Sequence, residues 1–357
     1  MTSLNRYPIH MDTKMTTSLL TNFGGLSLQS PLIVGACPMT LSEQSRLAMQ
    51  NAGVGAIVLP SLFEEQVIGW SIASGRTITQ REKEIYARAN RTEHNWAVQD
   101  AESYLSLVNR ASALQTVPII ASLNGFTAGG WMDFAGELEE AGASAIELNV
   151  PHSHARDYDN SVEIETIIRD AVREINAAIT IPLFVKLGRN FTSVPHIARQ
   201  LLSGAQGLVL HGRAPALDIS LETLNLTRQW KLTNSGVQSE SLDALMQVHS
   251  YCPAMPLAAS GGIGHADDLV KALLAGADVG MVTSAVYREG PDVIRTLLEG
   301  LVEFMERRQM KTLRDLQMQR PLEFNSDEER AAYIAALTEH LETSEKQALI
   351  SQARNES

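Results

Sequence analysis

Two short segments in the C-terminal third of the chain combine apolar residues with small ones in a pattern suited to holding a phosphate group. One contains Ser260-Gly-Gly-Ile, and the other contains Met281-Val-Thr-Ser-Ala. Glycines let backbone N–H groups approach an anion closely, and a helix that follows a strand directs its positive end to the same place. The expected phosphate cradle consists of Gly261, Gly262, Thr283 and Ser284.

Polar side chains end other apolar runs. Lys186 closes the run Pro182-Leu-Phe-Val-Lys, where its ammonium group could stabilise negative charge developing on a flavin ring or an enolate. The alternative is a lysine that extends to solvent. Asn149 can recognise the edge of a heterocycle or cap a turn. Asn124, which ends another run, is a candidate for contact with substrate.

Two histidines, His152 and His154, follow the fourth predicted strand. Because histidine titrates near neutrality, His152 is suited to general-base chemistry. The pair could also bind a metal ion, but no acidic residue with matching spacing completes a shell nearby, so we expect no metal site. After the sixth predicted strand, His211 and Arg213 offer a polar or cationic group, or else pair with a loop carboxylate such as Asp218.

Eight short runs of β-type residues are expected to position these side chains. Most are continuously apolar, as parallel strands covered on both faces must be, and segments of helical periodicity separate them. The predicted strands are Leu32–Ala36, Ala56–Leu59, Pro118–Ser122, Ala145–Asn149, Pro182–Lys186, Gly207–His211, Pro256–Ser260 and Asp278–Val282. The pattern predicts an α/β fold, a (β/α)8 TIM barrel, in which functional residues gather at the C-terminal ends of the strands.

The connections follow the same plan. Four helices are expected to end at a glycine before the next strand, as in Glu140-Ala-Gly-Ala and Leu274-Ala-Gly-Ala. Two connections are long, residues 61–116 after the second strand and 212–255 after the sixth, and both leave from the expected catalytic face. Residues 290–308 are predicted to form the eighth helix.

The predicted domain organisation is an N-terminal segment over residues 1–18, a barrel over 19–308 and a helical tail over 309–357. In the tail, Ser326-Asp-Glu-Glu is a capping box that starts an acidic amphipathic helix. We expect this helix either to pack on the barrel or to serve in association.

Composition limits the possible partners. The 357 residues carry a formal net charge of −12, which opposes an extended nucleic-acid footprint, whereas one local positive site can still hold a small anion. Two cysteines provide neither a disulfide framework nor an iron–sulfur site. The first eighteen residues contain no apolar signal region and no long apolar span follows, so we expect a cytoplasmic protein that binds no membrane.

Several phrases of the sequence together resemble the dihydroorotate dehydrogenase family of FMN-dependent barrels, most closely its bacterial dihydroorotate dehydrogenase-like branch. They span most of residues 19–305 and include Val58-Leu-Pro-Ser-Leu-Phe-Glu-Glu-Gln, Pro118-Ile-Ile-Ala-Ser-Leu-Asn-Gly, Ile146-Glu-Leu-Asn, Val185-Lys-Leu and Tyr287-Arg-Glu-Gly-Pro. The resemblance implies FMN as cofactor, with its phosphate on the cradle and its ring against Ala36, Asn149 and Lys186. It also implies a role in pyrimidine biosynthesis.

The departures from the family pattern fall on the substrate side. The family's catalytic cysteine or serine corresponds to His152, and its substrate-binding asparagine corresponds to His154. The lysine that members carry after the second strand corresponds to Pro60, and an Asn-Ser pair after the sixth strand corresponds to His211-Gly212. An orotate-shaped pocket is therefore not expected to be intact.

The leading hypothesis is an FMN-dependent oxidoreductase that oxidises (S)-dihydroorotate or a related planar cyclic substrate by hydride transfer to flavin N5. In this hypothesis His152 is the base, Lys186 is a second catalytic residue, and substrate contacts come from Asn124, His154 and His211. Partners would be a small-molecule substrate and an electron-acceptor protein or a second copy of the chain. Alternatives are a flavin- or phosphate-binding protein without turnover, a metal-dependent hydrolase, and a dihydrouridine synthase, which the acidic balance opposes.

Overall fold

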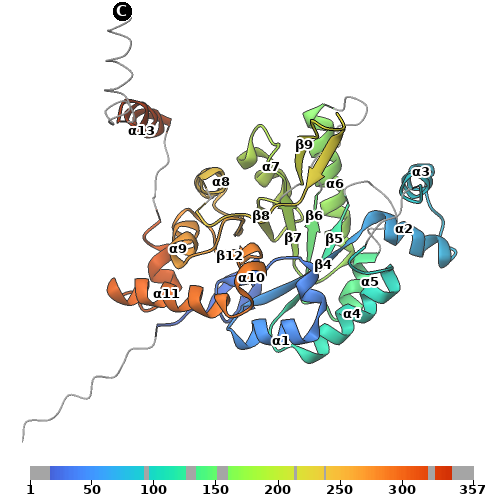
Figure 1. Cartoon of the computed structure of the whole chain (residues 1–357), viewed down its shortest axis with the longest axis horizontal. Coiled ribbons are helices and arrows are strands. Elements are labelled where there is room, and N and C mark those ends of the chain that lie inside the picture. The colour runs from blue at the N-terminus through green and yellow to red at the C-terminus, as the bar shows by residue number, and fades with distance from the viewer. Residues whose placement is uncertain are drawn as a thin grey trace, which may run out of the picture. The chain divides into compact units, whose positions relative to one another are not determined.

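The strands of the computed structural model close into the predicted parallel barrel (Figure 1). The structure describes residues 17–91, 96–125, 134–150, 160–212, 215–236, 239–320 and 326–339. Within these residues eight strands pair in the order β3-β4-β5-β6-β7-β8-β11-β12, and β12 returns to β3. Their bounds are β3 Leu32–Val34, β4 Ala56–Phe63, β5 Ile119–Asn124, β6 Ala145–Asn149, β7 Leu183–Leu187, β8 Gly207–Leu210, β11 Leu257–Ser260 and β12 Val279–Val282. All eight predicted strands and the predicted fold class are confirmed.

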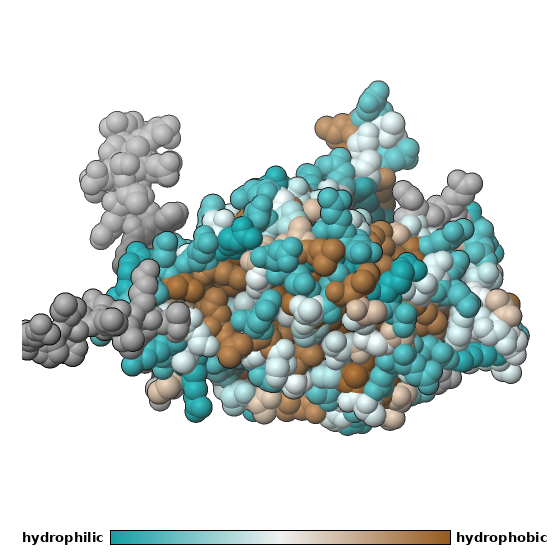
Figure 2. Space-filling model, turned by 90° about the horizontal axis from the view of Figure 1, so that it is seen from below, coloured by the Kyte–Doolittle hydropathy of each residue, from teal (hydrophilic) through white to brown (hydrophobic). Residues whose placement is uncertain are grey.

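Helices surround the strands (Figure 1) and bury the outward-facing side chains. Their bounds are α1 Glu43–Asn51, α2 Glu64–Ala73, α3 Gln80–Ala89, α4 Ala101–Leu114, α5 Phe134–Glu140, α6 Ser161–Ala178, α7 Val194–Leu201, α8 Ser239–Tyr251, α9 Ala266–Leu274, α10 Ser284–Glu289, α11 Val293–Arg307, α12 Leu313–Gln317 and α13 Ser326–Glu339, with a short 3-10 helix η1 at Pro38–Leu41. On the face seen in Figure 2, hydrophobic patches lie between hydrophilic residues. Amphipathic helices that cover a barrel produce such a mixed surface.

The barrel interior is closed at its lower end by a small hairpin, β1 (Thr21–Phe23) and β2 (Leu26–Leu28). Phe23 of this hairpin lies against Phe184 of β7, with ring centroids 4.3 Å apart, and both belong to the buried interior cluster. Gly207 makes room for the ring, because a Cβ there would lie 2.8 Å from Phe23 Cζ. With the lower end filled by side chains, the strand C-termini form the open end.

The turns before the strands largely follow the predicted design. Gly53, Gly142 and Gly276 have φ values of 96°, 100° and 121°, the left-handed conformation that ends a helix most cheaply with glycine. Gly204 differs, because its φ is not positive; a Cβ at this position would lie 3.0 Å from Val172 Cγ1. This glycine is therefore explained by close packing of α7 on α6 and not by a left-handed turn.

The two long connections carry additional structure. The connection after β4 forms α2 and α3 before the barrel helix α4, and the connection after β8 contains an antiparallel hairpin, β9 (Ala216–Ile219) and β10 (Leu226–Gln229), before α8. The hairpin forms a separate two-stranded sheet. Figure 1 shows β9 beyond the C-terminal ends of the barrel strands, so the hairpin lies on the side where the site is expected.

A tyrosine hydroxyl fills a gap in the backbone hydrogen bonding between β4 and β5. The register of this pair shifts between Val58 and Ser61, and Pro60 in this stretch has no N–H to donate. The hydroxyl of buried Tyr104, from α4, accepts from the Ser122 N–H at 2.8 Å and donates to the Ser122 carbonyl oxygen at 3.2 Å. Burial raises the pKa of this phenol well above its usual range. The hydroxyl thus replaces the missing backbone partner.

The C-terminal part divides at Arg320. The first compact unit ends there, and within it α12 packs against α9 while Arg320 donates to the Leu273 carbonyl oxygen at 2.9 Å. Residues 321–357 form the second unit, in which α13 begins at Ser326. No helix in the described ranges is long and apolar enough to cross a bilayer.

We predict that Tyr104→Phe destabilises the protein by about 2 kcal/mol, because it leaves the Ser122 N–H and carbonyl groups buried without their partner. Urea unfolding followed by circular dichroism would measure the loss. Tyr333→Phe, at a tyrosine 56% exposed on α13, is the matched control and should change stability by less than about 0.5 kcal/mol. Equal stabilities of the two variants would contradict the assigned role.

Candidate active site

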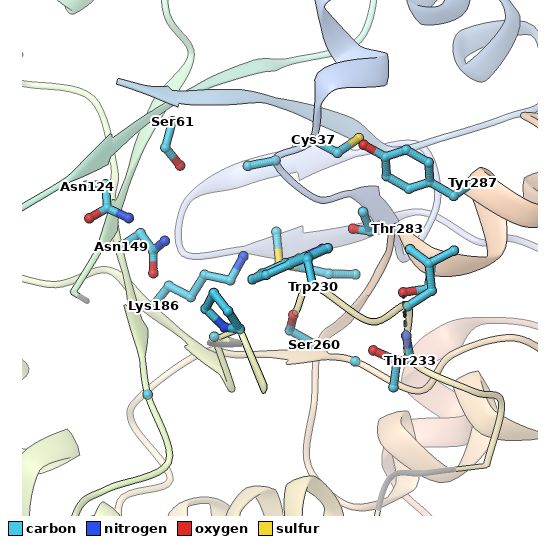
Figure 3. Close-up of a pocket in the computed structure, with 18 of the residues that line it drawn as sticks. Cys37, Ser61, Asn124, Asn149, Lys186, Trp230, Thr233, Ser260, Thr283 and Tyr287 are labelled. Atoms are coloured by element: carbon cyan, nitrogen blue, oxygen red, sulfur yellow. Dashed lines mark hydrogen bonds between the residues drawn. The ribbon is translucent and has the colours of Figure 1, made fainter. Parts of the chain in front are cut away.

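The strand register places four site residues at one level of the barrel. Phe63 pairs with Asn124, Asn124 with Asn149, and Asn149 with Lys186, across β4, β5, β6 and β7. Because side chains of a strand alternate between its two faces, residues at one level on neighbouring strands point the same way. All four residues line one cavity at the C-terminal end of the barrel, and Figure 3 shows Asn124, Asn149 and Lys186 near one another there.

This cavity has a volume of about 760 Å³ and opens at the barrel mouth, within the usual size range of small-molecule sites. It brings together most of the side chains predicted for cofactor and substrate. Those that line it are Ala36, Asn124, Asn149, Lys186, Gly261, Gly262, Thr283 and Ser284. Residues from all parts of the barrel sequence therefore meet in one place.

Both glycines of the predicted phosphate cradle adopt a left-handed backbone conformation. Gly261 and Gly262 have φ values of 99° and 77°, and a Cβ on Gly261 would meet nothing within 4 Å. This open space faces the cavity that both glycines line. Gly35, in contrast, is closely packed, because a Cβ there would lie 2.7 Å from Thr283 Oγ1. The absence of side chains thus leaves both the space and the placement of Thr283 that an anion would need.

The loop after β11 is held in shape by one carboxylate. Asp268 Oδ2 accepts from Ser235 Oγ at 2.6 Å and from the backbone N–H groups of Gly264 and His265 at 3.0 and 2.8 Å. Burial acts to raise the pKa of Asp268, but these hydrogen bonds outweigh it and the pKa lies below its usual value. The ionised side chain therefore connects the Gly261–His265 loop, α9 and the segment after β10.

Beneath the cavity, Lys186 is paired with a buried carboxylate. Lys186 Nζ lies 3.4 Å from Glu147 Oε1, and the two side chains are 13% and 2% exposed. Glu147 comes from β6, one level deeper than Asn149. Among the described residues, its second oxygen, Oε2, has no hydrogen-bond partner. The pair therefore keeps the ammonium group at the cavity floor instead of in solvent, so the snorkelling alternative for Lys186 is not what the structure adopts.

Cys37 follows β3 and lines the cavity beside the Tyr287 hydroxyl (Figure 3). Burial raises the pKa of the Cys37 thiol, so the uncharged form predominates at neutral pH. Its backbone is fixed by the Thr40 hydroxyl, which donates to the carbonyl oxygens of Cys37 at 2.8 Å and Val58 at 2.9 Å. Buried Arg46 donates in turn to the Thr40 carbonyl oxygen at 2.9 Å. Cys37 therefore forms part of the cavity wall, with its backbone held in place by Thr40.

The hairpin forms a wall of the cavity that sequence reasoning did not assign. Leu217 on β9 and Arg228 on β10 are cross-strand partners, and both line the cavity. Trp230 and Leu232 continue the same alternation and line it as well. The signal was present in Leu226-Thr-Arg-Gln-Trp-Lys-Leu, whose alternate residues share one face of an extended chain. Ser61, Phe63 and Tyr287 also line the cavity without having been assigned a role.

None of the predicted site histidines is part of the described cavity lining. His211 follows β8, is buried, and lies next to cavity-lining Gly212 without being part of the lining. His152, His154 and Arg213 lie outside the described residues. In the described ranges there is no group of three or more His, Cys, Asp or Glu side chains that could hold a metal ion.

Comparison with known proteins gives a consistent family. The model of the dihydroorotate dehydrogenase family matches residues 18–305. A putative dihydroorotate dehydrogenase A (fumarate) of Aeropyrum pernix is 30% identical over 56% of this chain and 67% of its own length. The catalytic subunit of dihydroorotate dehydrogenase B (NAD(+)) of Thermoplasma acidophilum is 22% identical, over 84% and 97%. Dihydroorotate dehydrogenase A (fumarate) of Limosilactobacillus reuteri is 26% identical, also over 84% and 97%.

We predict that Asp268→Asn lowers stability by about 2 kcal/mol at neutral pH, because charge-assisted hydrogen bonds become neutral ones. A carboxyl whose folded pKa is depressed stabilises the fold above its unfolded pKa of about 3.9 and loses this contribution as pH falls through the folded value. The difference between wild type and variant should therefore shrink in acid.

Urea unfolding at pH 7 and at successively lower pH would measure this. Asp267→Asn, an exposed neighbour on the same first turn of α9, is the control and should behave like wild type. A gap between wild type and Asp268→Asn that stays constant down to pH 2 would contradict the role given to the ionised carboxylate.

Proposed function

Because the chain belongs to the dihydroorotate dehydrogenase family, and so is an oxidoreductase that acts on a CH–CH bond, we propose that it binds FMN and oxidises a planar cyclic substrate. The substrate would be (S)-dihydroorotate or a related compound, and FMN would supply the hydride acceptor, flavin N5. The observation that carries the proposal is the meeting, in one cavity, of two left-handed glycines, the Asn149 amide and the Lys186 ammonium group.

The described residues fit FMN in kind. Gly261 and Gly262 are both left-handed, Gly261 leaves an open space that a Cβ would fill, and Thr283 and Ser284 belong to the same cavity lining. Asn149 and Ala36 would contact the ring system, since an amide can both donate and accept at a heterocycle edge. Gly212 keeps the floor open, because a Cβ there would lie 3.4 Å from both Asn149 Oδ1 and Lys186 Cγ.

FMN would supply the two-electron acceptor that no amino-acid side chain can provide. The protein's own contribution begins with Lys186, whose ammonium group would stabilise negative charge arising in the cavity as the substrate loses its hydride and proton. Its pairing with Glu147 holds that charge in place at 3.4 Å, so no side-chain reorganisation is required during the reaction.

We assign the proton transfer to His152 and the orientation of substrate to Asn124 and His154. His211, which is buried and does not line the cavity, is not assigned a contact with substrate. Support for His152 comes from the family resemblance, in which it corresponds to the base, and from the titration range of imidazole. Asn124 is supported by its position in the cavity lining beside Asn149.

The site favours a relative of dihydroorotate over dihydroorotate itself. Pro60, which corresponds to the lysine of family members, is buried in the irregular part of β4 and carries no charge. The cations that line the described cavity are instead Lys186 and Arg228. A substrate with its charge in a different place would match this arrangement.

The electron acceptor is proposed to be a soluble compound or a partner protein. The relatives carry names that specify fumarate in some cases and NAD(+) with a catalytic subunit in others. A homodimer is the other assembly that we consider. Size-exclusion chromatography with light scattering would establish which assembly this chain forms.

We predict that Gly261→Ala abolishes most FMN binding, leaving less than about one tenth of the flavin of wild type, because a Cβ enters the cradle. Absorption spectra of the purified protein and FMN released on denaturation would measure the content. Gly75→Ala is the matched control: Gly75 also has a positive φ, 71°, with nothing within 4 Å, but lies at the end of α2 away from the cavity. A full flavin content in Gly261→Ala would remove the cradle from the cofactor site.

We predict that His152→Ala leaves FMN bound but slows reduction of the flavin by substrate by about 10²- to 10⁴-fold, the usual contribution of a general base. Anaerobic stopped-flow absorption would follow the bleaching of the flavin, with dihydroorotate as the first substrate tried. Ser153→Ala, at the neighbouring position, is the control. Unchanged reduction kinetics in His152→Ala would show that the base lies elsewhere.

A further inference from the structure

The charge of the cavity lining is opposite to the charge of the protein. The chain carries a formal net charge of −12, yet the described residues that line the cavity include Lys186 and Arg228 and not one aspartate or glutamate. A cavity with cationic groups in an acidic protein concentrates anions locally. Lys186 is already paired with Glu147. Arg228 takes part in none of the ion pairs between described residues.

The surroundings of Arg228 are apolar. Its cross-strand partner Leu217 is 62% exposed, and Trp230, two residues along the same face, is also 62% exposed. All three line the cavity, and Trp230 stands near Lys186 and Ser260 in its mouth (Figure 3). Trp230 and Leu217, both largely exposed, therefore form with the Arg228 guanidinium group a surface with apolar area and one anchoring charge.

We propose that this surface, formed by Leu217, Arg228 and Trp230, selects a substrate that is an organic carboxylate with an apolar or aromatic body. The inference rests on the proposed function, because it concerns the substrate of the same site. Arg228 would hold the carboxylate through the paired N–H groups of its guanidinium fork. The indole of Trp230 would lie against the flat part of the body.

A site with this specificity would not suit a compact polar substrate. Dihydroorotate has amide groups around its ring, and their recognition requires several fixed polar partners. The hairpin offers carbon surface and one cation in their place. An apolar substrate body would cover the exposed parts of Leu217 and Trp230, and each covered carbon surface adds to affinity through the hydrophobic effect.

The test uses 2-naphthoate as a product-like aromatic carboxylate and 2-naphthamide as its uncharged counterpart. Isothermal titration calorimetry with the FMN-loaded protein should show at least about tenfold tighter binding of the acid, because a charge-assisted hydrogen bond is roughly twice as strong as a neutral one. Arg228→Gln should remove this preference. Trp230→Ala should weaken both compounds by about tenfold, and Trp230→Phe should restore most of the loss.

Arg81→Gln, at an exposed arginine of α3 outside the cavity, is the matched control and should bind like wild type. FMN content is measured for each variant. Equal preference for the acid in wild type and Arg228→Gln would overturn the proposal, as would loss of FMN in Arg228→Gln, which would assign that arginine to the cofactor. Binding of orotate but of neither naphthalene compound would overturn it too.

Failure of the proposed function gives a different result. If wild-type protein contains no FMN and takes none up, the flavin assignment fails, but calorimetry still reports whether the cavity prefers 2-naphthoate to 2-naphthamide. Retention of an Arg228-dependent preference in such protein would support the carboxylate surface on its own.

Discussion

The hydrogen-bond register of the closed parallel sheet is the constraint on which the rest of the structure depends. Closure requires each strand to pair on both sides, so a one-residue shift of one strand would break its pairing with both neighbours. Every inward-pointing side chain of that strand would then point outward. With the register fixed, Phe63, Asn124, Asn149 and Lys186 lie at one level although as many as 123 positions separate the first from the last. The lower end is filled by Phe23, and the upper end remains available for a ligand.

Polar groups near the upper end of the barrel are surrounded by apolar protein and need hydrogen-bond or ion-pair partners. These partners come from elements that are distant in the sequence. Tyr104 completes the hydrogen bonding between β4 and β5 where Pro60 has no N–H to donate. Lys186 forms an ion pair with Glu147. Asp268 fixes the glycine-containing loop by accepting from Ser235 and two backbone N–H groups. These contacts give the site a rigid frame, which is what preorganised electrostatic stabilisation requires.

The two walls of the cavity have different origins in the fold. The wall that contains Asn149, Lys186 and Gly261 comes from strand ends and short loops, whose positions the barrel dictates. The opposite wall comes from β9 and β10, an excursion of the chain between β8 and α8. Long loops at the C-terminal face of a barrel can change without altering the strands. Membership of the dihydroorotate dehydrogenase family is therefore compatible with a cavity wall, the β9–β10 hairpin, that is particular to this chain.

Local sequence determined the eight strands, the Gly261–Gly262 turn after β11 and the polar residues Asn124, Asn149 and Lys186 at or near the ends of three strands, because apolar runs and small-residue turns act over a few positions. It did not reveal that Tyr104 enters the β4–β5 ladder or that Glu147 pairs with Lys186, since neither pairing has a signature in residue spacing. Arg228 and Trp230 were missed although their alternation is visible, because an exposed hairpin and a site wall share that pattern until the chain is folded. Tertiary structure alone decided which strand ends and which loop residues face one another, because that depends on barrel closure and on contacts between segments far apart in the chain.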